Sequence, residues 1–324
     1  MQANRFLPLV LAALVSTGAA AAGQHALPYT LPAKLEQLRF VVQAKAPGGG
    51  TLDLYTDTSG GTFLTVAGAT KLKLPYKIPE KPQREAVGKA AWPSFDAGSW
   101  LPPPAADADG SLEVPILVPP RGVPGDGMLG LRWFAGRTVE WNYPEGTMRL
   151  LPRGALPKVA AAHVIPMGFR KDGRNPQATG FARITARVDG ADLQFMFATG
   201  ATFRLLKDVA PRFGEPVTSQ HAGSFIAVSH LEDWHARHPD WPYIAYGDAG
   251  ASMIQVPDME IAGWHTGPVW FASRKDRMFH EAIATLVDQP LDGALGGNAF
   301  ASFRITADYP SAKLAFEQLG KSGG

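Results

Sequence analysis

A short pattern occurs twice in this chain, 166 residues apart and without a gap. Each copy contains an Asp-Gly pair, a Leu-Gly pair, an aromatic residue and a Tyr-Pro pair. The matched positions are Asp126/Asp292, Gly127/Gly293, Leu129/Leu295, Gly130/Gly296, Phe134/Phe300, Tyr143/Tyr309 and Pro144/Pro310. A repeat of this extent indicates that two related structural units follow one another in the chain.

Matching strand-like segments accompany the two copies. The predicted hairpins occupy 38–44 with 51–56 and 181–188 with 192–197, and the predicted closing strands occupy 147–151 and 313–317. The first hairpin leads into residues 57–61, here called the first loop. The second hairpin leads into residues 198–202, the second loop. Both halves therefore share one order: a hairpin, a small-residue loop, a variable middle, an apolar-apolar-Gly segment and a closing strand.

This order predicts an all-β protein of two pseudo-symmetric, barrel-like lobes. We place the first lobe at 27–155 and the second at 163–320, with a linker near 152–162. Abundant turn residues, 35 Gly and 28 Pro among 324, favour short strands over a helical bundle. Few helices are expected: one opened by a capping box of Ser229 and Glu232, and an amphipathic one over 274–287.

The N-terminus has the features of a secretory signal peptide. Arg5 precedes an apolar run over 6–15, and small residues follow up to Ala20-Ala21-Ala22. We therefore expect residues 1–22 to be removed before Gly23 and the protein to be periplasmic or secreted. The apolar run is too short to cross a bilayer of about 30 Å, so no membrane association is expected after cleavage.

Charge and cysteine content narrow the function classes. The chain has 31 Lys and Arg against 29 Asp and Glu, a net charge of +2, and no basic stripe that would suit a nucleic acid. It has no cysteine, which excludes disulfides, thiolate metal sites and cysteine nucleophiles. We expect a monomer without a cofactor or metal.

The two loops resemble a known motif. The first reads Asp57-Thr58-Ser59-Gly60-Gly61 and the second reads Ala198-Thr199-Gly200-Ala201-Thr202, each after an apolar strand. With the later apolar-apolar-Gly strands, this arrangement resembles the pepsin-like and retropepsin-like aspartic proteases, here as a two-lobed, bacterial member. The resemblance covers about residues 35–320.

The resemblance implies a catalytic dyad of two carboxylates, one from each loop, that share a proton. In this sequence the dyad positions are Asp57 and Ala198, and an alanine methyl group cannot transfer a proton. Without a neighbouring carboxylate to raise its pKa, Asp57 is expected to be ionised at neutral pH. The positions that would support the dyad are Thr58, Ser59, Gly60, Thr199 and Gly200. Ser59 stands where the family usually has glycine, which affects how Asp57 is held.

The resemblance implies an endopeptidase scaffold that binds a peptide or protein in a cleft between the lobes and is inactive or strongly impaired as written. Ala198 has two explanations. It is either native, making a noncatalytic envelope protein that binds peptides or proteins, or an inactivating change in a protease. Substitution of the missing carboxylate by Asp192 or Asp208 is not expected. Six residues of strand, a span of about 20 Å, separate Asp192 from Ala198, and Asp208 lies beyond the loop with no reason to point inward.

Other chemistry-bearing residues have structural interpretations. The polar cluster His230, Glu232, Asp233, His235 and His238 lacks the spacing of a zinc helix and is expected to be the solvated face of a helix that buries Leu231 and Trp234. Trp92 and Trp100 are expected to pack in loops, with lining of a cleft over Asp57 as the alternative. A hairpin over 243–256 could overhang the cleft.

Overall fold

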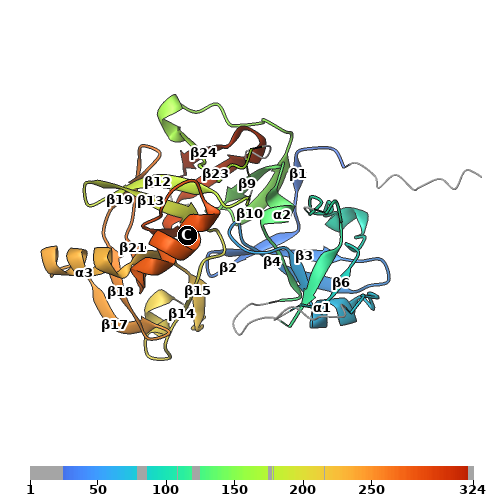
Figure 1. The fold of residues 1–324 in the computed structure, drawn as a ribbon, viewed down its shortest axis with the longest axis horizontal. Coiled ribbons are helices and arrows are strands. Elements are labelled where there is room, and N and C mark those ends of the chain that lie inside the picture. The colour runs from blue at the N-terminus through green and yellow to red at the C-terminus, as the bar shows by residue number, and fades with distance from the viewer. Residues whose placement is uncertain are drawn as a thin grey trace, which may run out of the picture.

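The computed structural model describes residues 25–78, 86–107, 109–118, 125–173, 177, 179–214 and 216–319, so the predicted signal peptide lies outside the described residues. Strands dominate and the helices are short, which confirms the all-β prediction. Figure 1 shows two bodies of sheet, with a third sheet above and between them. No helix in the described part of the chain is long and apolar enough to cross a bilayer.

A seven-stranded sheet forms the body on the right of Figure 1. Its strands, in spatial order, are β2 (Ala33–Glu36), β3 (Arg39–Lys45), β4 (Thr51–Thr56), β8 (Gly127–Leu129), β5 (Phe63–Thr65), β7 (Val114–Leu117) and β6 (Ala86–Ala90). β3 and β4 form the first predicted hairpin, whose turn is made possible by Gly48 and Gly49 at positive φ.

A nine-stranded sheet forms the body on the left. Its strands, in spatial order, are β17 (Tyr243–Asp248), β18 (Ala251–Val256), β21 (Val269–Arg274), β16 (Ser224–Ala227), β22 (Gly293–Leu295), β13 (Ala191–Phe197), β12 (Arg183–Val188), β19 (Met259–Ile261) and β20 (Trp264–Thr266). A separate pair, β14 (Thr202–Arg204) and β15 (Gln220–Ala222), follows the second loop. β12 and β13 form the second predicted hairpin, and β12 alternates buried and solvent-facing side chains as expected for a half-buried strand.

The third sheet contains strands from both halves of the chain. Its order is β1 (Tyr29–Thr30), β10 (Thr147–Leu151), β9 (Thr138–Asn142), β23 (Phe303–Asp308), β24 (Lys313–Gln318) and β11 (Val164–Pro166). At its centre β9 pairs antiparallel with β23, and Glu140 lies opposite Thr306, its own counterpart at the repeat spacing. The pseudo-twofold axis therefore passes through this sheet. Two tandem lobes alone do not predict this join, because it depends on pairing between residues more than 160 positions apart.

The helices differ in part from the predictions. They are α1 (Val66–Lys71), α2 (Leu131–Phe134), α3 (Val228–Arg237) and α4 (Gly297–Phe300), with short turns η1 (Ala97–Ser99), η2 (Ala161–His163), η3 (Ala210–Phe213), η4 (Met278–Ala282), η5 (Ile283–Leu286) and η6 (Tyr309–Ser311). The prediction of a capping box at Ser229 was wrong, because α3 begins at Val228 and Ser229 lies inside its first turn. The Ser229 amide donates instead to Asp276 Oδ1 at 3.1 Å. The helix over 274–287 is shorter than predicted and irregular, a π-helical turn followed by a 3₁₀ turn.

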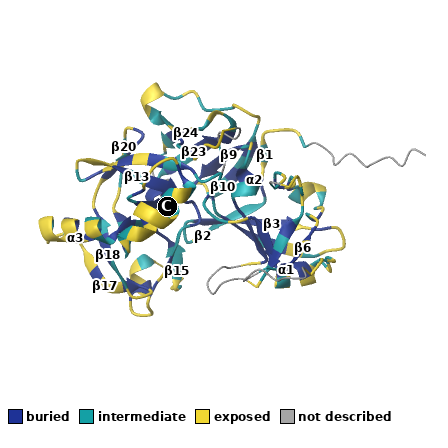
Figure 2. Ribbon diagram, in the orientation of Figure 1, coloured by how far each residue is buried: buried dark blue, intermediate teal, exposed yellow. Residues whose placement is uncertain are grey.

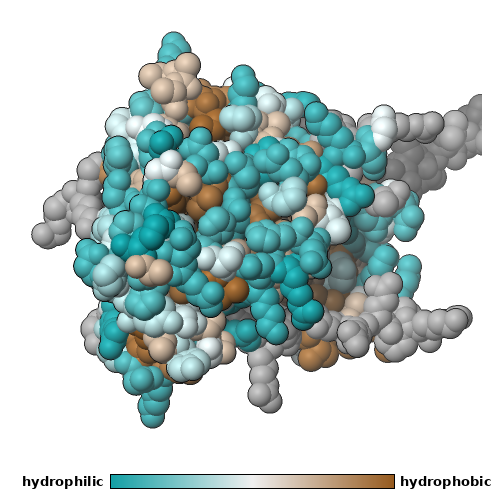
Figure 3. Space-filling view, turned by 60° about the vertical axis from the view of Figure 1, so that its left-hand side comes forward, coloured by the Kyte–Doolittle hydropathy of each residue, from teal (hydrophilic) through white to brown (hydrophobic). Residues whose placement is uncertain are grey.

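The core occupies the facing surfaces of the sheets. In Figure 2 the buried residues follow the strands, whereas much of α3 is exposed. Leu231 and Trp234 are the buried residues of α3, as predicted. Figure 3 shows a face on which hydrophobic residues form small areas among hydrophilic ones.

Candidate functional site

The two loops begin at equivalent points of the two main sheets. β4 pairs in parallel with β8, and β13 pairs in parallel with β22, so both copies of the repeated pattern lie beside the strand that ends in a loop. The Asp57 amide donates to Leu129 O at 3.0 Å, and the Ala198 amide donates to Leu295 O at the same distance. The backbone therefore presents residues 57 and 198 in the same way.

The repeated aspartates hold these strands. Asp126 Oδ2 accepts the Asp53 amide at 2.9 Å, and Asp292 Oδ2 accepts the Gln194 amide at 2.7 Å. Asp53 and Gln194 each lie four residues before the first residue of a loop. Each aspartate also has a cationic or imidazole partner, the Lys71 ammonium at 2.6 Å for Asp126 and His230 Nε2 at 3.1 Å for Asp292. Sequence analysis found this pair of aspartates as part of the repeat and missed their anchoring role.

The two loops meet through their threonines. The Thr58 amide donates to Thr199 Oγ1 at 3.2 Å, and the Thr199 amide donates to Thr58 Oγ1 at 3.0 Å. Thr58 Oγ1 also donates to Phe197 O at 2.7 Å. Two equivalent residues that donate hydrogen bonds to each other are typical of a twofold interface. Here both residues belong to the same chain. The structure thus brings Asp57, Thr58, Thr199 and Gly200 together, as the resemblance implies.

Asp57 is held by Ser59 and by the opposite loop. The Ser59 amide and hydroxyl both donate to Asp57 Oδ1, each at 2.8 Å. Burial between the loops raises the pKa of Asp57, and donors from Ser59 and the Gly200 amide oppose that rise without cancelling it. Desolvation therefore acts on this pKa in the same direction as a second carboxylate would, and the expectation that Asp57 is ionised at neutral pH stays a prediction.

Gly200 has no room for a side chain. A Cβ at this position would lie 2.4 Å from Asp57 Cβ and 2.6 Å from Asp57 Cγ. The glycine in the second loop is thus required by the aspartate in the first. Gly60 also lies against Asp57: a Cβ there would lie 3.0 Å from Asp57 Cβ and 2.4 Å from Met128 Sδ.

Tyr55 is a site residue that sequence analysis missed. Its hydroxyl donates to Gly200 O and lies 2.9 Å from Thr202 Oγ1, so it connects the first hairpin to the second loop. Burial raises the pKa of this phenol, and the nearby Asp57 adds to the effect. The alternation of side chains along a strand could have identified Tyr55, because it lies two residues before Asp57 and therefore shares its face.

Ala198 lies in apolar surroundings. It is 2% exposed and belongs to a cluster of buried hydrophobic residues. The other buried members are Met196, Ala227, Phe279, Val287, Leu291 and Ala294, and Ile283 packs against them. Phe279 and Ile283 come from the irregular helical segment η4–η5, which therefore covers the Ala198 side of the site.

The remaining candidates have structural roles. Trp100 stacks on His25 with ring centroids 4.9 Å apart, and both Trp92 and Trp100 pack against the core, which confirms the packing interpretation. His235 stacks on Tyr243 at 4.1 Å. Within the described residues, no group of three or more His, Asp or Glu side chains is placed to hold a metal ion. The hairpin over 243–256 forms as β17 and β18 at the edge of its sheet, and its position over a cleft stays a prediction.

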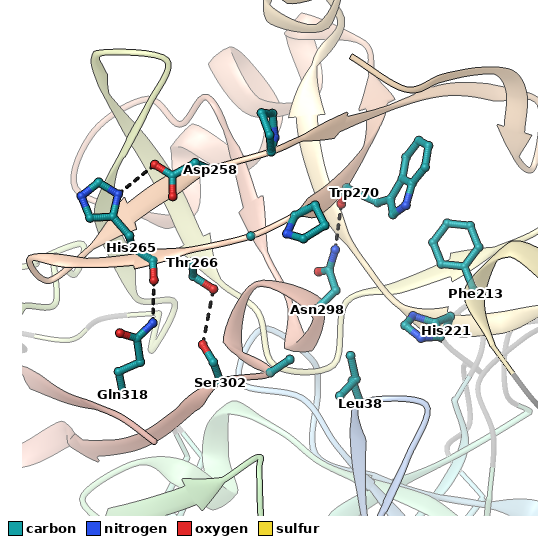
Figure 4. A pocket seen from close by; sticks show the side chains of 14 residues that line it. Leu38, Phe213, His221, Asp258, His265, Thr266, Trp270, Asn298, Ser302 and Gln318 are labelled. Carbon is teal, nitrogen blue, oxygen red and sulfur yellow. Dashed lines mark hydrogen bonds and ion pairs between the residues drawn. The ribbon is translucent and has the colours of Figure 1, made fainter. Parts of the chain in front are cut away.

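Three cavities follow one another from the first hairpin to the second half of the chain. One of about 110 Å³ touches Tyr55 and Glu36, a second of about 670 Å³ runs from Glu36 to Leu38 and His221, and a third of about 450 Å³ begins at those two residues. Figure 4 shows the third, with Trp270 and Phe213 on one side and the Thr266–Ser302 pair on the other. Asp57 and Ala198 line none of the three, and Tyr55 lines only the smallest.

Comparison with known proteins gives a fold. No family model and no curated protein matches the sequence. Among solved structures, the chain is similar to an aspartic proteinase from Irpex lacteus, with 10% identity, a TM-score of 0.52, and coverage of 91% of this chain and 98% of that one. It is also similar to Basic 7S globulin from soybean, with 8% identity, a TM-score of 0.45, and coverage of 91% and 96%. The likeness to the Irpex lacteus structure shows that the chain has the pepsin-like fold of the aspartic proteinases.

Proposed function

We propose that this chain is an exported peptide-binding protein built on an aspartic proteinase scaffold, with peptide hydrolysis absent or strongly impaired. The observation that carries the proposal is the contrast at the two dyad positions. Asp57 lies among hydrogen-bond donors, whereas Ala198 lies in a closed apolar cluster. The bound species would be a peptide or an exposed protein segment, and we expect a monomer in the periplasm or outside the cell.

The chemistry supports this proposal. In a dyad, one carboxylate takes a proton from water while the other gives a proton to the scissile carbonyl. A single positioned acid-base group contributes about 10²- to 10⁴-fold, and groups that act together are lost together. Asp57 has no partner for this exchange, because residue 198 offers only a methyl group.

The shape of the molecule supports binding. The threonine contact keeps the backbone of both loops in the arrangement of the fold, although one carboxylate is missing. The successive cavities between Tyr55 and Trp270 offer a path along the join of the two halves. Charged side chains at the Tyr55 end, namely Lys34, Glu36 and Asp53, suit a ligand with its own charges or backbone polar groups.

A direct experiment compares binding and cleavage. The chain from residue 23 is incubated with an immobilised library of peptides at pH 4 and pH 7, and retained and cleaved peptides are identified by mass spectrometry. We expect retention without cleavage. Cleavage that disappears in Asp57→Asn but persists in Asp192→Asn, a matched change at a solvent-exposed carboxylate, would contradict the proposal. The absence of any retained peptide at both pH values would also contradict it.

Export is checked separately. Expression of the full chain in a bacterial host, followed by cell fractionation, should place the protein outside the cytoplasm with Gly23 as its first residue. A product found in the cytoplasm with residues 1–22 intact would overturn this part of the proposal.

A further inference from the structure

Arg39 is a buried cation at the join of the two halves. It is the first residue of β3 and is 7% exposed. Its Nη1 donates to Gln220 Oε1 at 3.1 Å, and its Nε is buried without a partner. Among the described residues, no carboxylate forms an ion pair with Arg39. A buried charge that has no counterion is unfavourable, so the fold keeps a cation that it does not neutralise.

The nearest carboxylate in the sheet has another partner. Glu36 lies directly opposite Arg39 in the β2–β3 ladder, a position at which opposite charges commonly interact. Glu36 pairs instead with the Lys34 ammonium at 2.6 Å, whereas Arg39 reaches Gln220 in β15 of the second half. The charge of Arg39 is therefore left for a group that the described residues do not supply.

A strained turn fixes the start of β3. Gln37 and Leu38 have φ values of 51° and 60°, in the left-handed region that residues other than glycine rarely adopt. The second half holds this turn, because the Ala222 amide donates to Gln37 O at 2.9 Å and Leu38 O leaves no room for a Cβ at Gly297. Strain of this kind persists where the surrounding structure enforces it, and it is common at binding sites.

Arg39 lines the cavity of about 670 Å³ between the two halves. Glu36, already paired with Lys34, is the only carboxylate among the described residues that line it. His221 lines the opposite side, and its Nδ1 donates to Ala222 O at 2.8 Å. Burial lowers the pKa of His221, and the nearby Arg39 charge adds to this effect. Arg39 is thus the cation that an anionic group would meet in this cavity.

The cavity continues into an apolar one. Leu38 and His221 also line the neighbouring cavity of about 450 Å³, which contains Trp270 and Phe213 (Figure 4). An occupant of both would meet a cation at one end and aromatic rings at the other. A peptide segment offers both kinds of group, since its side chains differ in charge and polarity.

On the basis of the proposed function, we infer that the cavity lined by Arg39 and His221 binds a carboxylate of the peptide, with Arg39 as its counterion. The carboxylate belongs to an acidic side chain or to the C-terminus. A guanidinium suits it because its N–H groups match the two oxygens of a carboxylate. The preferred peptide then has an apolar or aromatic side chain close to the carboxylate, which enters the cavity that contains Trp270.

The test uses the chain from residue 23 and two peptide libraries of the same sequences, one with free and one with amidated C-termini. Enrichment of Asp and Glu in both libraries would identify an acidic side chain as the bound group, and retention from the free-acid library alone would identify the C-terminus. Arg39→Gln should weaken binding of the retained peptides about 10-fold or more in fluorescence polarisation. Arg39→Lys keeps the charge and should weaken it less. Arg187→Gln, at an exposed arginine of β12, is the matched control and should not change binding.

A second measurement does not depend on peptides. Glutarate, a small dicarboxylate, should raise the thermal unfolding midpoint of the unaltered chain, whereas glutaramide, its neutral counterpart, should not. Glutarate should also leave the midpoint of Arg39→Gln unchanged. The libraries and the comparison of glutarate with glutaramide use the unaltered chain, so they test the inference even if Arg39→Gln does not fold.

Two results would overturn the inference and leave the proposed function in place. One is retention of peptides without any preference for a carboxylate in either library. The other is equal affinity of the unaltered chain and Arg39→Gln for the retained peptides. If no peptide is retained, the proposed function fails, and equal midpoints with glutarate and glutaramide would then overturn the inference as well.

Discussion

The first and second loops share a backbone frame and differ in what surrounds their first residue. Both start from a strand held by an aspartate of the repeat, and both donate the same hydrogen bond to the apolar-apolar-Gly segment. Asp57 then accepts hydrogen bonds from hydroxyl and amide donors, whereas Ala198 belongs to a buried apolar cluster that also contains Phe279. The frame is thus maintained by contacts that do not involve the dyad side chains, so the fold persists where the chemistry is incomplete.

The largest expected effect concerns the apolar cover over the second loop. Phe279→Ala removes a buried aromatic side chain from the apolar cluster that contains Ala198 and should lower the free energy of unfolding by about 3–5 kcal/mol. Its exposed neighbour provides the control, since Met278→Ala should change stability by less than about 0.5 kcal/mol. Denaturant unfolding measures both. Equal effects would mean that η4 does not close the second loop.

The threonine contact allows a direct comparison of the two loops. Thr58→Val leaves both Phe197 O and the Thr199 amide without their partner and should cost about 3 kcal/mol. Thr199→Val leaves the Thr58 amide without its acceptor and removes a long hydrogen bond from the Thr199 hydroxyl to Thr58 Oγ1, 3.3 Å, and should cost about 1–2 kcal/mol. The two variants have the same change in volume and act as controls for each other in denaturant unfolding. A reversed order would contradict the asymmetry of this contact.

The repeated aspartates should behave alike. Asp126→Ala and Asp292→Ala each remove the acceptor for a strand amide and a charged or imidazole partner, and each should cost about 2 kcal/mol. In chemical unfolding, the losses of the two variants should agree, and the variant that combines both changes should lose their sum to within about 0.5 kcal/mol, because the two sites are separate. A large difference would show that the two aspartates occupy equivalent places in the fold but contribute unequally to its stability.

The smallest effect is a difference in pH dependence between Asp57 and Asp292. Burial raises the pKa of Asp57 in the folded state, so its ionisation destabilises the fold as pH rises, and Asp57→Asn should be stabilising at pH 7 and less so below pH 4. Burial also acts on Asp292, but hydrogen bonds from His230 and Gln194 outweigh it and lower the pKa.

Asp292 therefore stabilises the fold above the ordinary aspartate pKa of about 3.9, and that stability is lost as pH falls through the lower folded value. Asp292→Asn should be destabilising at pH 7 and approach neutrality in acid. Thermal unfolding from pH 2 to pH 8 gives both profiles. Profiles of the same sign would contradict the different environments of the two carboxyl groups.

The local and periodic features of this protein were readable from its sequence. The hairpins before Asp57 and Ala198, the closing strands and the burial of Leu231 and Trp234 all follow from patterns within a few residues or from the repeat itself. The repeat also indicated that the two loops should meet, because duplicated units tend to associate about a twofold axis. Their residue types carried the resemblance to the aspartic proteases.

Only the tertiary structure decided what those residues face. Contacts between distant segments decide the register of Glu140 against Thr306 and the link from Tyr55 to Gly200. They also decide the apolar cluster that holds both Phe279 and Ala198, and the raised pKa of Asp57. Ser229 illustrates the same limit at short range, since a good capping pattern was overridden by where β16 delivers the chain into α3. Burial and packing are properties of the assembled chain, and no local pattern specifies which distant side chain fills a given space.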